Sequence, residues 1–305
     1  MPQDKPIIGI ALMLAFCITV PFGDALAKLL GDRIDVAQLV AIRMAVQVIL
    51  LYPIVRLSGI SLRMSRRLTL LSGIRALLHI IGIGFMFLSL RYLPLADAVA
   101  IAFVMPFLML ILGHFILGEE VGARRIIACA VGFIGTLMVI QPNLMEVGWP
   151  ALLPLVVAVD FAFFMLVTRT LAKETDPMAL QVVSGAIACA LLIPLFALLT
   201  PFGTPGFAIT TPIGSTWGLL LLMGLLGTLA HLMMTWALRF APSATLAPMQ
   251  YLEIPMAAAV GWLIFAEFPN GLALAGIMVT IAAGLYIIVR EQRLSRPKPA
   301  SPLAE

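Results

Sequence analysis

The hydrophobic residues of this chain are gathered into long blocks separated by short polar segments. Each block holds roughly twenty mainly apolar residues, which is the length that an α-helix needs to cross about 30 Å of hydrocarbon. The alternating pattern of an outer-membrane barrel is absent from the sequence. The pattern therefore predicts an all-α, polytopic membrane protein with ten transmembrane helices, at residues 7–29, 36–57, 69–90, 95–117, 124–141, 149–171, 178–200, 216–239, 244–266 and 272–290.

Two of these predicted helices, together with the turns before them, repeat each other. Leu90–Glu119 aligns with Leu238–Glu267 at a constant offset of 148 residues, and seven of the thirty aligned positions are identical. Such self-similarity indicates a chain built from two related halves. Because five crossings is an odd number, the second half must cross in the opposite sense, as in an inverted repeat. We expect five-helix repeats at residues 1–145 and 146–290, followed by a disordered cytoplasmic tail at 291–305.

The basic residues lie mostly in alternate loops between the predicted helices. Of the 19 Lys and Arg residues, fourteen fall on the side of the N-terminus, three fall on the opposite side, and Arg43 and Arg75 lie within helices. Cytoplasmic loops carry the excess of Lys and Arg. Both termini are therefore predicted to be cytoplasmic, in a multi-pass protein of the cell inner (plasma) membrane.

Composition supports a membrane protein and argues against several other classes. Charged residues make up 11% of the chain, against about 25% in a soluble domain. The net charge of +4 comes from loop residues that the topology explains, so we expect no nucleic-acid partner. Cys17, Cys129 and Cys189 lie in apolar blocks and are interpreted as small hydrophobes. Motifs of the GxxxxGK[ST], HExxH and GxSxG types are missing from the sequence, which predicts no ATP site, no metal, no cofactor and no enzyme.

Two proline-bearing segments carry a resemblance to a known family. MPFLMLILGHFILGE and EIPMAAAVGWLIFAE each end in a glutamate, and each is followed by a glycine-marked helix (Gly132 and Gly135, Gly276 and Gly284). Over residues 7–290 the chain resembles the EamA-type members of the drug/metabolite transporter superfamily. The phrase FGDALAKLL, from Phe22 to Leu30, is further similar to a bacterial subgroup linked with uptake of riboflavin or S-adenosylmethionine.

This resemblance implies a secondary transporter that moves a small organic metabolite across the lipid bilayer by alternating access, without ATP. Uptake of a vitamin-like solute (riboflavin) or of S-adenosylmethionine is the leading expectation, and export of amino acids or toxic metabolites is the alternative. A non-transporting membrane scaffold or sensor is the alternative from another class, and a homodimer stays open. Inverted repeats place the substrate site near the midplane, so polar residues at that depth are the candidates.

Glu253 is the first candidate for a substrate or proton pathway. It lies about nine residues, or roughly 14 Å, into the ninth predicted helix, beside Gln250 and Tyr251. An ionisable group at this depth is costly and normally faces a cavity or a partner. The alternative is a carboxyl group that is permanently paired with Arg43 or Arg75, or protonated in the core.

Pro106 and Pro255 mark the fourth and ninth predicted helices as sites of a helix break. A proline removes a backbone donor and frees a carbonyl, so an interrupted helix at either point can bind a solute or a proton. The two prolines are not equivalent by the repeat, because Pro255 is shifted by one residue and Pro248 has been added. We expect these two helices to be the movable elements.

Two predicted helices carry a buried arginine. Arg75 shares a helix face with His79, four residues away, and either points into a cavity or snorkels to water. Arg43 lies at the depth of Asp24, so an Asp24–Arg43 pair, with Lys28 one turn from Asp24, is the structural alternative to a role in binding. In a cavity, either guanidinium would hold a carboxylate or phosphate.

The remaining candidates are a carboxyl group, two histidines and several aromatic rings. Asp160 lies in the middle of the sixth predicted helix among phenylalanines, where it either carries a coupling proton or makes one hydrogen bond to a neighbouring helix. His231, like His79, could titrate in the physiological range, or simply satisfy a backbone carbonyl. The aromatic rings that could stack on a planar solute, or only pack, are Tyr251, Trp236 and Phe164.

Overall fold

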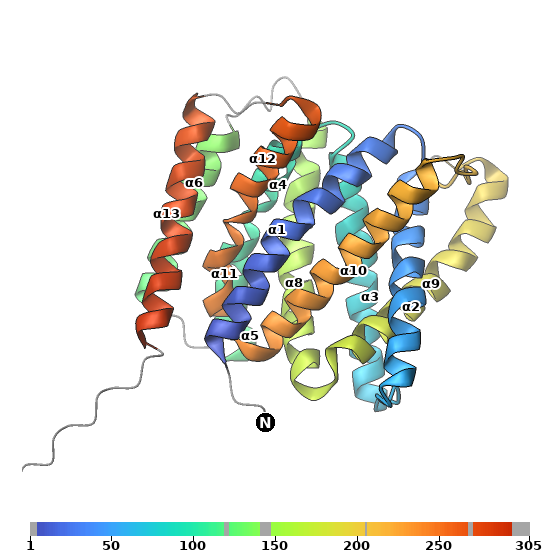
Figure 1. Cartoon of the computed structure of the whole chain (residues 1–305), viewed down its shortest axis with the longest axis horizontal. Helices are drawn as coiled ribbons and strands as arrows, with labels where there is room; N and C mark the ends of the chain where they lie inside the picture. Colours follow the sequence, from blue (N-terminus) through green and yellow to red (C-terminus); the bar gives the residue numbers. More distant parts are fainter. Residues whose placement is uncertain (1–4, 119–121, 141–147, 205, 268–270, 295–305) are drawn as a thin grey trace, which may run out of the picture.

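The computed structural model describes residues 5–118, 122–140, 148–204, 206–267 and 271–294. Within these ranges the chain is helical and contains no strand, which confirms the predicted all-α class (Figure 1). The elements are α1 (Pro6–Gly31), α2 (Val36–Leu57), α3 (Arg66–Ser89), α4 (Leu95–Ala102), α5 (Met105–Leu117), α6 (Ala123–Ile140), η1 (Trp149–Leu152), α8 (Leu153–Glu174), α9 (Pro177–Leu199), η2 (Thr200–Phe202), α10 (Thr216–Phe240), α11 (Ser243–Gln250), α12 (Glu253–Phe265) and α13 (Gly271–Leu294).

Many of these helices are long and apolar enough to cross a membrane. In the described part of the chain, three shorter apolar stretches lie at Ile126–Gly135, Glu253–Phe265 and Leu274–Ala283. Length and composition thus make the chain a multi-spanning membrane protein. The seven segments that qualify by themselves are Pro6–Gly31, Val36–Leu57, Arg66–Ser89, Leu95–Leu117, Trp149–Glu174, Pro177–Phe202 and Thr216–Phe240.

Helix ends follow local capping chemistry that hydropathy does not record. The Ser65 side chain accepts a hydrogen bond from the Leu68 amide at 3.3 Å, so α3 begins three residues before the predicted start. Asp176 likewise accepts from the amides of Met178 and Ala179 at the start of α9. At the other end of the chain, α13 continues to Leu294, so the predicted tail begins too early. Residues 295–305 lie outside the described residues.

The predicted helices 95–117 and 244–266 are each broken near the middle. The first divides into α4 and α5 at residues 103–104, and the second into α11 and α12 at residues 251–252. The two breaks are separated by 148 residues, the offset of the sequence repeat. Helices α5 and α12 also end alike. Each is followed by a residue in the left-handed conformation, Gly118 at φ 64° and Ala266 at φ 57°. Each break lies shortly before the proline from which it was predicted, which is Pro106 in the first helix and Pro255 in the second.

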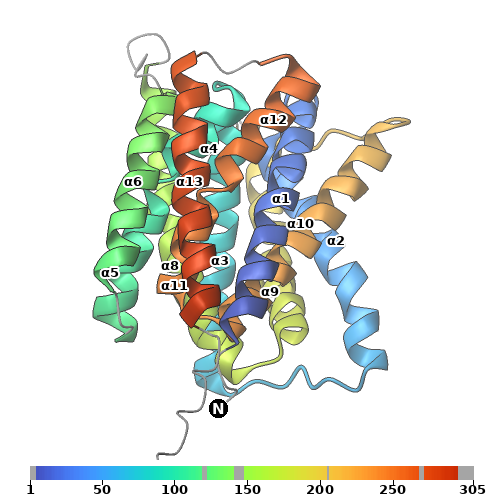
Figure 2. The same ribbon diagram turned by 60° about the vertical axis from the view of Figure 1, so that its left-hand side comes forward.

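Helices from the two halves of the chain are interleaved. Helix α1 packs along α10, and α3 packs along α8. The broken segments cross in the same way, because α5 packs on α8 and α12 packs on α1. Figures 1 and 2 show α6 and α13 side by side at one edge, while α2, α9 and α10 lie on the opposite side. Helix α1 begins, and α13 ends, at the lower side of Figure 1.

Polar contacts tie the loops at both ends of the bundle. Arg91, after α3, donates to the Ile34 carbonyl at 2.9 Å, and Arg239, near the end of α10, donates to the Thr175 carbonyl at 2.9 Å. These two arginines are identical positions of the sequence repeat. On the side where α1 ends, Lys28 forms an ion pair of 2.6 Å with Glu267. The second oxygen of that carboxylate accepts from the Leu95 amide at 3.1 Å, at the start of α4.

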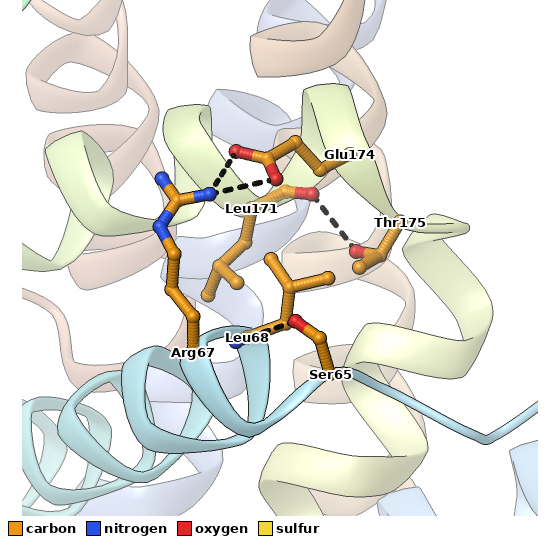
Figure 3. A network of polar contacts seen from close by, with 6 residues as sticks. All are labelled: Ser65, Arg67, Leu68, Leu171, Glu174 and Thr175. Carbon is orange, nitrogen blue, oxygen red and sulfur yellow. Dashed lines mark hydrogen bonds and ion pairs between the residues drawn. The ribbon is translucent and has the colours of Figure 1, made fainter.

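Glu267→Ala is expected to lower the free energy of unfolding by about 1–3 kcal/mol, because it removes a charged cap from α4 and a partly buried ion pair. Glu174→Ala is the matched control. Figure 3 shows both carboxylate oxygens of Glu174 turned to the guanidinium of Arg67. The Nη1–oxygen distances are 2.9 and 3.0 Å. That pair is exposed, so its loss should cost less than about 1 kcal/mol. Thermal unfolding in detergent tests this contrast, and equal losses in both variants would contradict it.

Candidate functional site

A cavity of about 80 Å³ lies among the helices of both halves. The lining side chains come from α1, α2, α3, α8, α10 and both broken helices. They are Phe16, Val20, Asp24, Arg43, Gly82, Ile83, Met86, Val99, Ala102, Phe103, Met105, Val157, Phe161, His231 and Glu253.

Four ionisable side chains line this cavity. Asp24 and Glu253 come from the neighbouring helices α1 and α12, whereas Arg43 and His231 come from the neighbouring helices α2 and α10. All four are buried, with exposed fractions of 3–8%. Glu253 is the first residue of α12, directly after the break. The cavity lining therefore carries two carboxyl groups, a guanidinium and an imidazole.

The position of Arg43 is set by contacts with three neighbouring residues. Its Nη2 lies 3.0 Å from Nδ1 of His231, and its guanidinium lies over the Phe87 ring at 5.8 Å from the centroid. The same Nδ1 lies 3.1 Å from the Gly227 carbonyl oxygen. It accepts from the guanidinium when the ring proton is on Nε2, and it donates to the carbonyl when the proton is on Nδ1. A Cβ atom at Gly227 would lie 2.8 Å from Cζ of Arg43. The guanidinium thus occupies space that only a glycine leaves open.

The expected Asp24–Arg43 pair is not formed. The ion pairs among the described residues are Lys28–Glu267, Arg67–Glu174 and Arg91–Asp35. Lys28 therefore turns to Glu267, which lies 239 residues away in sequence, and not to Asp24. Glu253 is likewise not paired with Arg43 or Arg75 in this part of the chain. Asp24, Glu253 and Arg43 face a common cavity without neutralising one another at contact distance.

Arg75 neither snorkels to water nor lines the cavity. Its exposed fraction is 0%, and its guanidinium donates to Thr168 at 2.9 Å, Ser184 at 2.5 Å and Gln181 at 3.1 Å. The cation also lies over the Phe164 ring, 4.7 Å from the centroid. In place of the two orientations predicted from the sequence, the guanidinium is bound by neutral acceptors on α8 and α9. Arg75 joins three helices.

The two buried histidines are not isolated from each other. The rings of His79 and His231 stack with centroids 4.4 Å apart, and His79 also lies 4.8 Å from the Phe164 ring. Nε2 of each histidine has no hydrogen-bond partner among the described residues. Asp160 Oδ2 also lacks one there, and it lies against Gly82, a residue that lines the cavity. Of the three predicted residues, only His231 reaches the cavity.

The aromatic residues of the cavity differ from the expected ones. Tyr251 is fully buried at the break before α12, where its ring packs against Phe103 at 5.7 Å between centroids. Gln250 is also buried and bonds the Met165 sulfur at 2.9 Å. Trp236 stacks on Phe240. Like Phe164, these side chains are outside the cavity lining, which instead includes Phe16, Phe103 and Phe161.

The sequence carried a signal for only one of these three rings. Phe103 aligns with the aromatic Tyr251 at the repeat offset, which distinguishes it from other membrane phenylalanines. Phe16 and Phe161 are common residues in apolar helices, and their orientation depends on how each helix is rotated. Asp24 was expected as a structural partner and instead lines the cavity.

The many-helix fold and the charged cavity inside it define a membrane protein able to take up a small solute. The EamA-like transporter family matches the chain at residues 7–141 and again at 148–290. The chain belongs to this family, as its sequence resemblance predicted. It is a small-metabolite transporter that works in a lipid bilayer, which confirms the functional class expected from the sequence.

Curated relatives are named for several small solutes. A riboflavin transporter of Rhizobium johnstonii is 32% identical over 231 residues, covering 74% of this chain and 72% of its own length. An S-adenosylmethionine uptake transporter of Rickettsia felis is 26% identical over 294 residues, covering 96% of each chain. The pseudopaline exporter CntI of Pseudomonas aeruginosa is 27% identical over 292 residues, covering 95% of this chain and 96% of its own. The family is thus clear, whereas the relatives differ in solute and direction.

A solved crystal structure has the same fold. It superposes with a TM-score of 0.72 and covers 95% of this chain and 98% of its own, at 17% sequence identity. At this identity the similarity establishes the fold alone.

Proposed function

We propose that the chain is a secondary transporter built from two inverted five-helix repeats, at residues 1–145 and 146–290, with both termini cytoplasmic in the bacterial inner membrane. The ten crossings are α1, α2, α3, α4 with α5, α6, α8, α9, α10, α11 with α12, and α13. The shared position of the two helix breaks supports this arrangement, as does the family's separate match to each half. The excess of basic residues on the side of the N-terminus supports the orientation.

The transport mechanism is alternating access around the central cavity. The two broken helices are the elements that move, because an interrupted helix can rotate one segment without moving the other. Both breaks lie at the cavity, where Phe103 and Glu253 are lining residues. Either Glu253, which lines the cavity, or Asp160, which lies behind the lining residue Gly82, exchanges a proton or contacts the solute as the cavity opens to one side and then the other. This mechanism requires no ATP and no enzymatic step.

Riboflavin and S-adenosylmethionine are the leading solutes, and uptake is the proposed direction. The proposal draws on the names of the relatives from Rhizobium johnstonii and Rickettsia felis. Export is the second candidate, and the pseudopaline exporter from Pseudomonas aeruginosa favours it. A carrier without an ATP motor follows the gradient that it is given, so both directions are measured in the same experiment.

The observation that carries the proposal is an internal cavity lined by the buried side chains of Asp24, Arg43, His231 and Glu253 in a chain of a transporter family. The test is uptake of labelled riboflavin, S-adenosylmethionine and amino acids by vesicles containing the protein. Glu253→Gln is compared with Asp32→Asn, which alters an exposed carboxyl at the end of α1. We expect saturable transport of one solute, reduced at least about tenfold by Glu253→Gln and unchanged by Asp32→Asn. If no solute moves in either direction through correctly inserted protein, the scaffold alternative replaces the carrier.

A further inference from the structure

We propose that a buried polar layer around Arg75 is the gate that closes the transport path on the side where α1 begins, and that the contact between Arg43 and His231 belongs to its counterpart on the other side. This inference rests on the proposed transport function and names the side chains that close each end. The gate layer consists of Gln47, Arg75, Thr168, Gln181, Ser184 and Thr235, from α2, α3, α8, α9 and α10.

Gln181 links most of the gate layer. Its Oε1 accepts from Arg75 at 3.1 Å and from Gln47 at 3.3 Å, and its Nε2 donates to the Thr235 hydroxyl at 3.4 Å. The same guanidinium donates to Thr168 and Ser184. All six side chains of the layer belong to residues that are 0–1% exposed. Water therefore does not reach the layer in this conformation, and the bundle is closed at this level.

The ends of α1, α9 and α10 show on which side the gate layer lies. The Lys5 amide, directly before α1, donates to the Phe240 carbonyl at the end of α10, at 2.6 Å. Arg239, also near the end of α10, donates to the Thr175 carbonyl in the turn between α8 and α9. The start of α1, the end of α10 and the start of α9 are therefore on one side of the bundle.

The gate layer and the cavity occupy different halves of the bundle along the helix axes. Gln181 lies in the first half of α9, and Thr235 lies in the second half of α10, toward the side where α1 begins. The cavity residues Asp24 and Arg43 lie in the second half of α1 and the first half of α2, toward the opposite side. The layer thus separates the cavity from the side where α1 begins.

The contacts of the two buried arginines occupy equivalent interfaces of the proposed repeat. Helices α2 and α9 are the second helices of the two halves, and α3 and α10 are the third. Helix α2 packs on α10, with Arg43 against His231, and α9 packs on α3, with Gln181 and Ser184 against Arg75. In an inverted repeat such equivalent interfaces face opposite sides of the membrane, so one can be closed while the other is open.

The two interfaces differ in how completely the cation is bound. All three nitrogens of the Arg75 guanidinium are bonded, whereas Arg43 has one such contact, through Nη2, within the described chain and lines the cavity. A column of rings joins the two cations. Arg75 lies over Phe164, whose ring is 4.8 Å from His79, and His79 stacks on His231. The Arg75 interface is thus the closed one, and the rings connect it to the other.

The polar composition of the gate layer suits an interface that has to separate. An apolar interface loses its hydrophobic stabilisation when water enters between the helices. Hydrogen bonds to neutral acceptors are exchanged for bonds to water at a small net cost. Arg75 has no carboxylate partner in the described ranges, so opening breaks no ion pair there. The layer can therefore seal the closed state and still become hydrated in the open one.

The first experiment measures the reactivity of two single cysteines on opposite sides of the proposed gate. Cys17, Cys129 and Cys189 are first replaced by alanine. Thr235→Cys then reports on the gate layer, and Met86→Cys reports on the cavity lining. A membrane-impermeant thiol reagent is added to each side of the membrane separately. We expect slow reaction of the first variant, from the side where α1 begins, and faster reaction of the second, from the other side.

Arg75→Gln should shift the protein toward opening on the side where α1 begins. Glutamine stays polar when hydrated but is too short to reach all three acceptors, so the closed state loses more than the open state. The reaction rate of Thr235→Cys should rise about tenfold, and that of Met86→Cys should fall by a similar factor. Arg63→Gln, in an exposed loop, is the control and should change neither rate. A rise in both rates would indicate a loosened fold and would overturn the proposal, as would unchanged rates.

Gln181→Glu is expected to act in the opposite direction. A carboxylate at this position keeps the contact with Arg75 and adds an ion pair, so the gate should open less often. Thr235→Cys should react about tenfold more slowly, without a loss of thermal stability. Uptake of labelled riboflavin or S-adenosylmethionine, whichever the parent transports, should slow by a similar factor. Unchanged or faster reaction would contradict the gate. If the parent shows saturable transport and neither variant changes the two rates as expected, the gate is rejected and the transporter function stands.

Discussion

Gly227→Ala should reduce transport by about tenfold or more while the helix bundle stays folded. A Cβ atom at this position would lie 2.8 Å from Cζ and 3.0 Å from Nη2 of Arg43. Such contacts are too close, and the guanidinium, at the end of a flexible side chain, is the group that must move. It would then lose its contact with His231 and its place in the cavity wall. A lost charged hydrogen bond of about 1.5–3 kcal/mol corresponds to about a tenfold to hundredfold effect.

Gly218→Ala is the matched control for this variant. Gly218 is in the same helix, α10, and a Cβ atom there would meet nothing within 4 Å. Alanine favours a helix over glycine by about 1 kcal/mol, so this variant should be as stable as the parent or more so. Initial transport rates are compared per amount of inserted protein, and thermal unfolding checks both folds. Unchanged transport in Gly227→Ala would show that the position of Arg43 is unimportant.

Arg75→Ala should lower the free energy of unfolding by about 3–5 kcal/mol. The change leaves a cavity in the bundle and removes the donors that satisfy Thr168, Ser184 and Gln181. Arg75→Met keeps most of the volume and should cost about 1–3 kcal/mol, because only the hydrogen bonds are lost. The measurement is chemical or thermal unfolding in detergent.

Arg63→Ala serves as the control for the loss of an arginine. Arg63 is exposed in the loop between α2 and α3, so its removal should change stability by less than about 0.5 kcal/mol. A stability of Arg75→Ala equal to that of Arg63→Ala would mean that the buried guanidinium does not hold α3, α8 and α9 together.

The apolar blocks were enough to predict where most helices lie, since a membrane-spanning helix must satisfy its backbone internally and shield it with apolar side chains. They could not locate the breaks at 103–104 and 251–252, because a short interruption leaves the length and the average hydropathy of an apolar block almost unchanged. The prolines indicated the correct helices. They did not indicate the register, since Pro106 is the second residue of α5 whereas Pro255 is the third residue of α12.

The sequence indicated three of the residues that line the cavity but not which side chains pair. Counting helical rise predicts that Glu253, Arg43 and Asp24 lie at membrane depth, and all three line the cavity. Which charged side chains pair depends on the rotation of each helix about its axis and on which helices become neighbours. This is why Lys28 could be matched to Asp24 on its own helix, when its true partner, Glu267, comes from the other half of the chain.

The contact between Phe103 and Tyr251 links the two helix breaks to each other. These residues are the first positions of the two helix breaks, and their rings pack with centroids 5.7 Å apart. If the two breaks are the hinges of the proposed cycle, neither can rotate far without displacing the ring of the other, so the two hinges should move together. In the proposed cycle, this shared element makes simultaneous opening to both sides of the membrane costly, and it thereby keeps the carrier from acting as a leak for ions or solutes.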